Sequence, residues 1–272
     1  MNPKSTSARF ASNFRISPVG NATAGLPAGF ILVCVLAFAG SIAATAYFCR
    51  SMAGGMGMPG GWTMSMMWMR MPGQSWMISA AMFLLMWLTM MVAMMLPSAL
   101  PTFLKTRRKW ASLCSVASGY FAVWLAAGTV IYVLGVVFAT AAMRWDSLSR
   151  VVPFLSGAAL IGAGAFQFTR WKLTSLLRCR SPFGCGVSCL QHETNFGLGC
   201  KQGAACCICC AAPMLVLVVL GMMNPFVIIG VAVAIAAEKI LPRPETVARF
   251  LGVSAIVFGV IYFSKMFASI TQ

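Results

Sequence analysis

The amino-acid sequence predicts an all-α protein, a polytopic bundle of about seven transmembrane helices. Of its 272 residues, 60% are hydrophobic and only 9% are charged, whereas a soluble domain has about 25% charged residues. The apolar residues are gathered in runs, and roughly 20 such residues in a helix cross a bilayer core about 30 Å thick. The alternation typical of membrane β-barrels is absent from the sequence. Helices, which satisfy their own backbone hydrogen bonds in lipid, are therefore expected.

Seven apolar segments are the expected spans. They lie at about 28–49, 76–103, 111–139, 151–170, 197–222, 224–241 and 250–269. The sixth is short, and Met223–Asn224–Pro225 joins it to the fifth as a tight helical hairpin. Pro97 and Pro101 predict a kink or an early stop near the end of the second. Residues 1–27 are interpreted as a flexible basic cytoplasmic tail, and residues 28–272 as the transmembrane helical domain.

Basic residues are distributed unequally between the two ends of these spans. With the N-terminus inside, 14 Lys and Arg residues lie on the inner side and 4 on the outer side. This excess predicts a cytoplasmic N-terminus and an external C-terminus in a multi-pass protein of the cytoplasmic membrane. The net charge of +16 is assigned to anionic lipid headgroups rather than to nucleic acid.

The predicted outer loop, residues 50–75, is rich in methionine and contains no Asp, Glu or His. Thioethers are soft ligands that suit Cu(I), so this loop is a candidate site for metal capture. Its candidate ligands are Met64, Met66 and Met67. The alternative is an interfacial segment, because the loop also carries tryptophans typical of the headgroup level and methionine is an adaptable apolar residue.

A second methionine pattern runs along the second span, where residues four apart share one helix face. Its members are Met82, Met86, Met90 and Met94. Met90 and Met94 are the candidate ligands of a relay of soft sites through the bilayer. Packing between helices is the alternative explanation of the same stripe.

The predicted inner loop, residues 172–196, gathers thiol and imidazole groups. Its candidate ligands are Cys179, Cys185, Cys189 and His192, and His192 is the only histidine of the chain. Thiolate and imidazole are the groups that a soft or borderline metal site uses. The spacing is not that of a zinc finger, and incidental thiols in a solvated basic loop are the alternative.

Four cysteines fall within five positions of the stretch "GAACCICCAAPM", residues 203–214. On a helix with about 3.6 residues per turn, Cys206, Cys209 and Cys210 share one face, and Cys207 lies about 100° around from Cys206. Two thiolates on one face suit the low coordination number of Cu(I). Cysteine also packs as a small hydrophobe, and small residues are favoured where membrane helices meet, so packing stays open as the alternative.

Charges within the spans are few. Glu238 ends the sixth span and Lys201 begins the fifth, and an ionisable group at membrane depth suggests a function. The alternative is that both lie at the inner interface and pair with each other. The sequence contains no nucleophile elbow, P-loop, dinucleotide fingerprint or HExxH, so an enzyme is not expected.

Several motifs together resemble a bacterial family of predicted metal-binding integral membrane proteins that carry a domain of unknown function. The motifs are "AMMLPS" at 93–98, Phe166 through Lys172, Cys179 through Pro182, Gly203 with Cys206, Cys209 and Cys210, Met223–Asn224, and Glu238–Lys239. The resemblance covers about residues 80–240. It implies metal handling and singles out the same three cysteines as the helical periodicity.

The chain departs from this family pattern at three positions. Gln202 stands where the family often has a histidine, and Leu176 and Arg178 stand where it often has a further cysteine and histidine. These differences shift the implied ligand set toward sulfur alone.

Two functional hypotheses follow from these patterns. In the first, the chain binds a soft metal ion, Cu(I), for transport or delivery, in exchange with a membrane-protein partner or a metallochaperone. In the second, it is a non-catalytic subunit or assembly partner of a membrane enzyme complex, and its Met and Cys residues serve packing.

Overall fold

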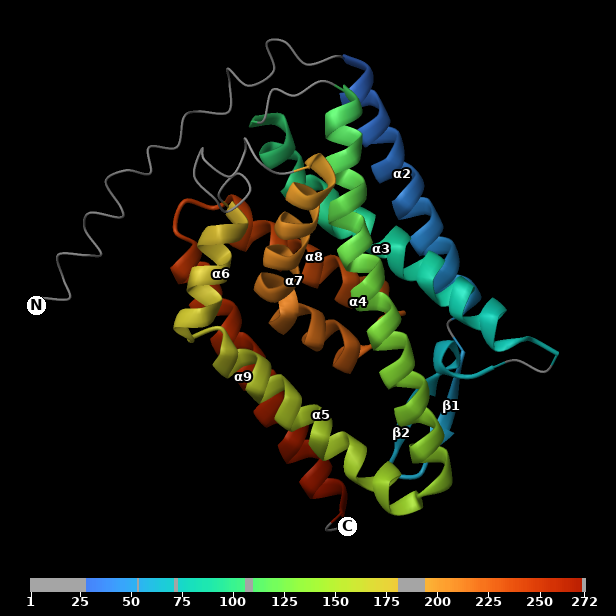
Figure 1. Cartoon of the computed structure of the whole chain (residues 1–272). Helices are drawn as coiled ribbons and strands as arrows, with labels where there is room; N and C mark the ends of the chain where they lie inside the picture. The colour runs from blue at the N-terminus through green and yellow to red at the C-terminus, as the bar shows by residue number, and fades with distance from the viewer. Residues whose placement is uncertain (1–27, 53, 71–72, 106–109, 181–193, 271–272) are drawn as a thin grey trace, which may run out of the picture.

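The computed structural model describes residues 28–52, 54–70, 73–105, 110–180 and 194–270. Within them the chain forms a helical bundle with one small β-hairpin (Figure 1). The helices are α2 (Ala28–Ser51), α3 (Trp76–Lys105), α4 (Trp110–Arg144), α5 (Asp146–Phe166), α6 (Arg170–Arg180), α7 (Asn195–Leu220), α8 (Pro225–Ile240) and α9 (Pro244–Ile270). The hairpin consists of β1 (Gly55–Met58) and β2 (Trp62–Ser65), followed by the short 3-10 helix η2 (Met66–Trp68). The predicted tail, Cys185, Cys189 and His192 lie outside the described residues.

The all-α fold class is confirmed, with one correction to the number of spans. Six of the described helices, α2, α3, α4, α5, α7 and α9, are long and apolar enough to cross a membrane. The sixth predicted segment does form a helix, α8, but its 16 residues reach only about 24 Å at 1.5 Å per residue, short of a bilayer core. The predicted hairpin of helices five and six is present, because Gly221 to Asn224 join α7 directly to α8.

Two local predictions need correction. Helix α3 does not stop at Pro97 or Pro101 but continues to Lys105. The first part of the predicted inner loop, residues 172–180, belongs to α6. The hydroxyl of Thr169 starts this helix by accepting a hydrogen bond from the Lys172 amide at 3.3 Å, which is the role of an N-cap side chain.

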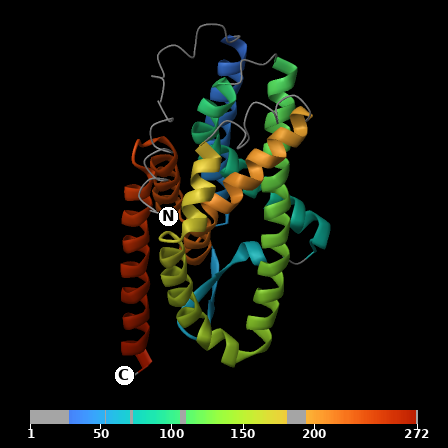
Figure 2. The ribbon, with the colours of Figure 1, turned by 60° about the vertical axis from the view of Figure 1, so that its left-hand side comes forward.

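Glycines let the longest helices approach closely. A Cβ at Gly199 of α7 would lie 2.1 Å from the Val116 carbonyl oxygen of α4, and one at Gly203 would lie 2.8 Å from that of Tyr120. This pair, four residues apart, is the small-residue pattern that allows membrane helices to pack backbone to backbone. Helix α9 lies along α5 in the same way (Figure 2), where Gly164 approaches Gly252.

The β-hairpin at residues 55–65 was not predicted from the sequence. Its strands are antiparallel with Met56 opposite Met64, and the turn uses Gly60 and Gly61 at φ of 104° and 76°, which glycine adopts without strain. The hairpin lies against the start of α5: the Trp62 indole donates to the Ser149 carbonyl at 3.0 Å, and the Ser149 hydroxyl donates to the Pro59 carbonyl at 2.8 Å.

The outer surface of the bundle is apolar, while a set of polar side chains lies inside. Exposed leucine, valine, isoleucine and phenylalanine side chains cover α2, α4, α8 and α9, as expected where lipid is the solvent. The fully or almost fully buried polar residues include Lys172, Gln202 and Glu238. Lys172 and Glu238 form an ion pair, and Gln202 bonds to the Cys179 carbonyl of α6. Both contacts border the centre described next.

Candidate metal centre

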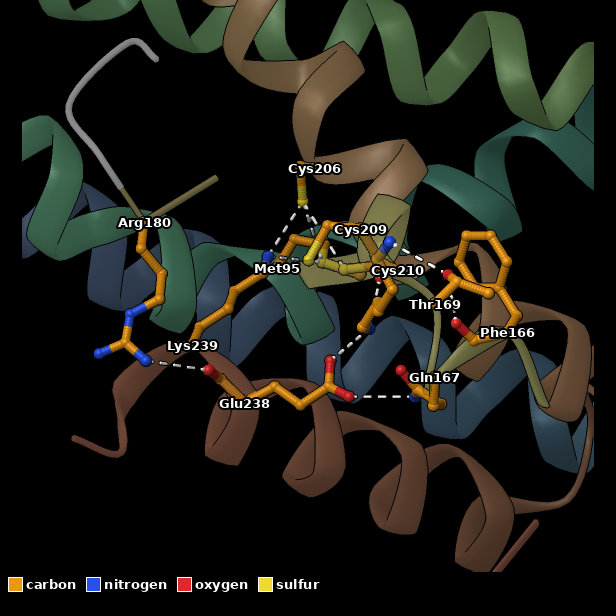
Figure 3. Close-up of polar contacts among 11 residues, drawn as sticks. Met95, Phe166, Gln167, Thr169, Arg180, Cys206, Cys209, Cys210, Glu238 and Lys239 are labelled. Carbon is orange, nitrogen blue, oxygen red and sulfur yellow. Dashed lines mark hydrogen bonds and ion pairs between the residues drawn. The ribbon is translucent and has the colours of Figure 1, made fainter. Parts of the chain in front are cut away.

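Four cysteine thiols converge where α6, α7 and α8 meet. Figure 3 shows those of Cys206, Cys209 and Cys210. Cys206, Cys209 and Cys210 come from one face of α7 and are fully buried, and Cys179 of α6 is almost fully buried beside them. Cys207 is only half-buried, because it lies on another side of the helix. The division of the four clustered cysteines that periodicity predicted is therefore the division that the structure has.

The sulfur atoms of this group are in direct contact. The Cys206 Sγ lies 3.9 Å from both the Cys210 Sγ and the Met95 Sδ of α3. The Cys179 thiol lies beside those of Cys206 and Cys209, and its interaction with these two groups, together with burial, raises its pKa well above the usual value. Two sulfurs that each bind one metal at about 2.3 Å stand about 4 Å apart in trigonal geometry, so these separations fit a shared ion.

This group differs from a formed site of hard or borderline ligands. Among the described residues, no three His, Cys, Asp or Glu side chains are arranged to hold one metal ion. The Cys206 sulfur lies 3.9 Å from those of Cys210 and Met95. Two thiols and one thioether are a donor set for a soft ion of low coordination number, and Cu(I) is the biological ion of that kind.

A positive charge and a hydroxyl lie against the Cys206 sulfur. The Lys239 ammonium of α8 is 3.0 Å from the Cys206 Sγ, 3.7 Å from the Met95 Sδ and 3.2 Å from the Ser98 Oγ. The Tyr120 hydroxyl of α4 donates to the same Sγ at 2.9 Å. Hydrogen bonds and positive charge favour the thiolate form of a cysteine, and the thiolate is the form that binds metals.

One of the three positions at which the chain departs from the family pattern, Gln202, also borders the centre. Gln202 lies one turn before Cys206 and is buried, and its Nε2 donates to the Cys179 carbonyl at 2.8 Å. Its Oε1 has no hydrogen-bond partner. Gln202 therefore joins α7 to the Cys179 backbone and adds no sulfur or imidazole to the centre.

The helical turn of α7 that carries Cys206, Cys209 and Cys210 is called the cysteine turn. A buried ion pair lies on the other side of it. The Lys172 Nζ is 2.7 Å from the Glu238 Oε2, with both side chains about 1% exposed. The Gln167 Nε2 donates to the other Glu238 oxygen at 3.0 Å. The alternative in which Glu238 pairs with Lys201 is therefore wrong, because the Glu238 carboxylate is paired with Lys172 of α6.

The methionines of the second predicted span differ in burial. Along α3, Met86, Met90 and Met94 are buried and Met82 is exposed, so most of the stripe faces the bundle interior. The thioether in contact with Cys206 is nevertheless that of Met95, which was not among the candidate ligands.

The outer methionines divide in a similar way. Met64 and Met67 are buried, and Met64 packs with Met58 against Ala139 and Ala142 of α4. Met66 is 40% exposed. Two of the three candidates in this loop are therefore engaged in packing.

Four residues of the centre, Tyr120, Met95, Lys172 and Lys239, were missed as site residues, although Lys239 belongs to the family motif Glu238–Lys239. Tyr120 and Met95 are single members of long apolar runs, and no sequence signal separates them from packing residues. Lys172 had a signal, because it belongs to the family motif at 166–172 and falls at the edge of an apolar segment. The sequence alone did not show that its side chain turns inward.

The sequence of the chain matches one known protein family over most of its length. Residues 84–262 match the PpoB2 family, which is described as a copper chaperone. The chain belongs to this family. Comparison with curated proteins and with solved structures found no match.

The PpoB2 match includes every residue of the centre from Met95 to Lys239. It begins after the β-hairpin at residues 55–65, so the outer methionine loop lies outside the matched region. The family assignment therefore bears on the cysteine centre and not on the hairpin.

Proposed function

We propose that the chain is a membrane-embedded Cu(I) chaperone of the cytoplasmic membrane that binds the ion at the cysteine centre and delivers it to a partner protein. The residues that would hold the ion are Cys179, Cys206, Cys209, Cys210 and Met95. The observation that carries the proposal is the convergence of four buried thiols, one thioether and one ammonium at the same point.

Charge balance favours a monovalent ion at this centre. Cu(I) bound by two thiolates carries a net charge of −1, and such a charge is costly to bury without a partner. The ammonium of Lys239, 3.0 Å from Cys206, supplies the compensating charge. The fully buried lysine of this region, Lys172, is neutralised by Glu238 and adds no net charge.

The excess of sulfur ligands suits transfer better than permanent storage. A Cu(I) ion uses two or three ligands at a time, and this centre offers five sulfur atoms within one turn of α7 and its neighbours. One sulfur can then leave the ion while a thiol or thioether of the partner binds it. The role is non-catalytic, and the partner is expected to be a membrane protein or metallochaperone with soft ligands.

The test is Cu(I) binding by the purified full-length protein in detergent under reducing conditions. Copper is quantified by mass spectrometry, and affinity is measured by competition with a chromophoric Cu(I) chelator. We expect wild type to retain copper, and the variant Cys206→Ser/Cys209→Ser/Cys210→Ser to lose it. Cys207→Ser is the matched control, because Cys207 lies on the same helix but away from the centre.

Two outcomes would contradict the proposal. If wild type binds no Cu(I), the cysteines serve packing, and the chain is better described as an assembly partner of a membrane complex. If the triple variant and Cys207→Ser both bind copper as wild type does, the ion is held elsewhere.

A further inference from the structure

Helix α7 contains a proline directly after the cysteine turn. Pro213 lies inside the helix and is buried, and proline has no backbone N–H to donate. In an α-helix the N–H of one residue bonds to the carbonyl four residues earlier. Pro213 therefore leaves the carbonyl of Cys209 without its helical partner, within a part of the bundle that water does not reach.

The side chain of Lys172 supplies the missing donor. Its Nζ lies 2.7 Å from the Cys209 carbonyl oxygen and 2.7 Å from the Glu238 Oε2. Gln167 in turn donates to the other oxygen of Glu238. A chain of hydrogen bonds thus runs from the end of α5 through α8 and α6 to the backbone of α7 at the cysteine turn.

This bond fixes the part of α7 that carries two of the four thiols. Cys209 and Cys210 belong to the turn whose carbonyl Lys172 holds, and Cys206 begins the same turn. On α8, Glu238 serves Lys172 while the adjacent Lys239 contacts the Cys206 sulfur. Two consecutive residues of α8 therefore act on the cysteine turn: Glu238 through Lys172, and Lys239 by direct contact with the Cys206 sulfur (Figure 3).

We propose that Lys172 is a positioning residue of the copper centre: it holds the Cys209 carbonyl that Pro213 frees, and so sets where the thiols of Cys209 and Cys210 lie relative to Cys206 and Cys179. This inference rests on the proposed function. A role in stability alone is a weaker account, because replacing a buried ion pair by apolar residues is often neutral or stabilising.

The test removes the ion pair and then restores the helical bond. In Lys172→Met/Glu238→Met, no charge is left unpaired but the Cys209 carbonyl has lost its donor. We expect Cu(I) affinity to fall by about 10- to 100-fold, the usual effect of losing a group that orients a metal ligand. Adding Pro213→Ala supplies an N–H at position 213 that can bond to Cys209, and should return the affinity to within about threefold of wild type.

The rescue separates positioning from a general structural role. Pro213→Ala alone is the matched control and should bind Cu(I) as wild type does, because either donor then satisfies the carbonyl. An unchanged affinity in Lys172→Met/Glu238→Met overturns the inference, and so does a loss that Pro213→Ala fails to reverse. Failure of wild type to bind Cu(I) would instead overturn the proposed function.

A milder variant keeps the test decisive if the double variant does not fold. Gln167→Ala removes only the bond to Glu238 and leaves the ion pair in place. It should weaken Cu(I) binding by about threefold or more through a less well held Lys172, and Pro213→Ala should again reverse the effect. No change in Gln167→Ala would contradict the inference.

Discussion

The ammonium of Lys239 lies 3.0 Å from the sulfur of Cys206, inside a bundle whose outer surface is apolar. The Lys239 side chain is half-buried, and a charge drawn into an apolar bundle in this way favours a partner of opposite sign. Glu238, the nearest acid in sequence, is already paired with Lys172. The thiolate of Cys206, or a copper ion held by two thiolates, is therefore the negative group that Lys239 is placed to neutralise.

Replacing this charge should weaken copper binding. In Lys239→Met the Cu(I) complex of two thiolates keeps a net negative charge with no compensation, so we expect its affinity to fall at least tenfold, or about 1.4 kcal/mol. Chelator competition measures the change. Lys201→Met is the control, because Lys201 lies on α7 one turn before the centre but is exposed. Tighter binding in Lys239→Met would mean that the ammonium competes with the metal.

A side chain at Gly199 should disrupt the crossing of α4 and α7. Its Cβ would lie 2.1 Å from the Val116 carbonyl oxygen, and backbone atoms cannot move aside as a flexible side chain can. We expect Gly199→Ala to cost about 1–3 kcal/mol and to lower the melting temperature in detergent. Gly162→Ala on α5, where a Cβ meets nothing within 4 Å, should leave stability unchanged or raise it by up to about 1 kcal/mol, because alanine favours a helix over glycine. Equal stability of the two variants would contradict this account of the crossing.

Much of this fold could be predicted because hydropathy and helix length are local properties. The spans and the face shared by Cys206, Cys209 and Cys210 follow from runs of apolar residues and from helical periodicity. Helix α6 could not be recognised as a helix in this way. Its mean hydropathy is low because Arg170, Lys172 and other basic residues interrupt it, so it was predicted as part of a loop.

The partners across helices could not be predicted, because packing decides which buried face meets which neighbour. Met90, Met94 and Met95 are all buried on α3, but only the packing of α3 near α7 and α8 brings Met95 to Cys206. In the same way, Glu238 pairs with a lysine 66 residues away. Helical spacing gives candidate ligands on each helix and leaves their combination undetermined.

The methionines of the outer hairpin should be oxidised at different rates, because their side chains differ in exposure to solvent. In the folded protein, Met56 and Met66 are 45% and 40% exposed, whereas Met64 is 2% exposed. Mild hydrogen peroxide should therefore convert the first two to sulfoxides well before Met64, since access governs this reaction. Peptide mass spectrometry over a time course measures each site, and denatured protein is the control in which all three should react alike. Equal rates in the folded protein would show that the hairpin does not protect Met64.

The two ends of the bundle should face opposite sides of the membrane. Figure 1 shows the β-hairpin at the end of the bundle opposite the turn between α8 and α9, and the excess of basic residues predicts that the latter end is cytoplasmic. In intact cells, a membrane-impermeant maleimide should label Thr63→Cys in the hairpin but reach Pro242→Cys only after permeabilisation. Both positions are exposed, and peptide mass spectrometry separates their labels from those of the native cysteines. The reverse pattern would invert the orientation, and the hairpin methionines would then face the cytoplasm.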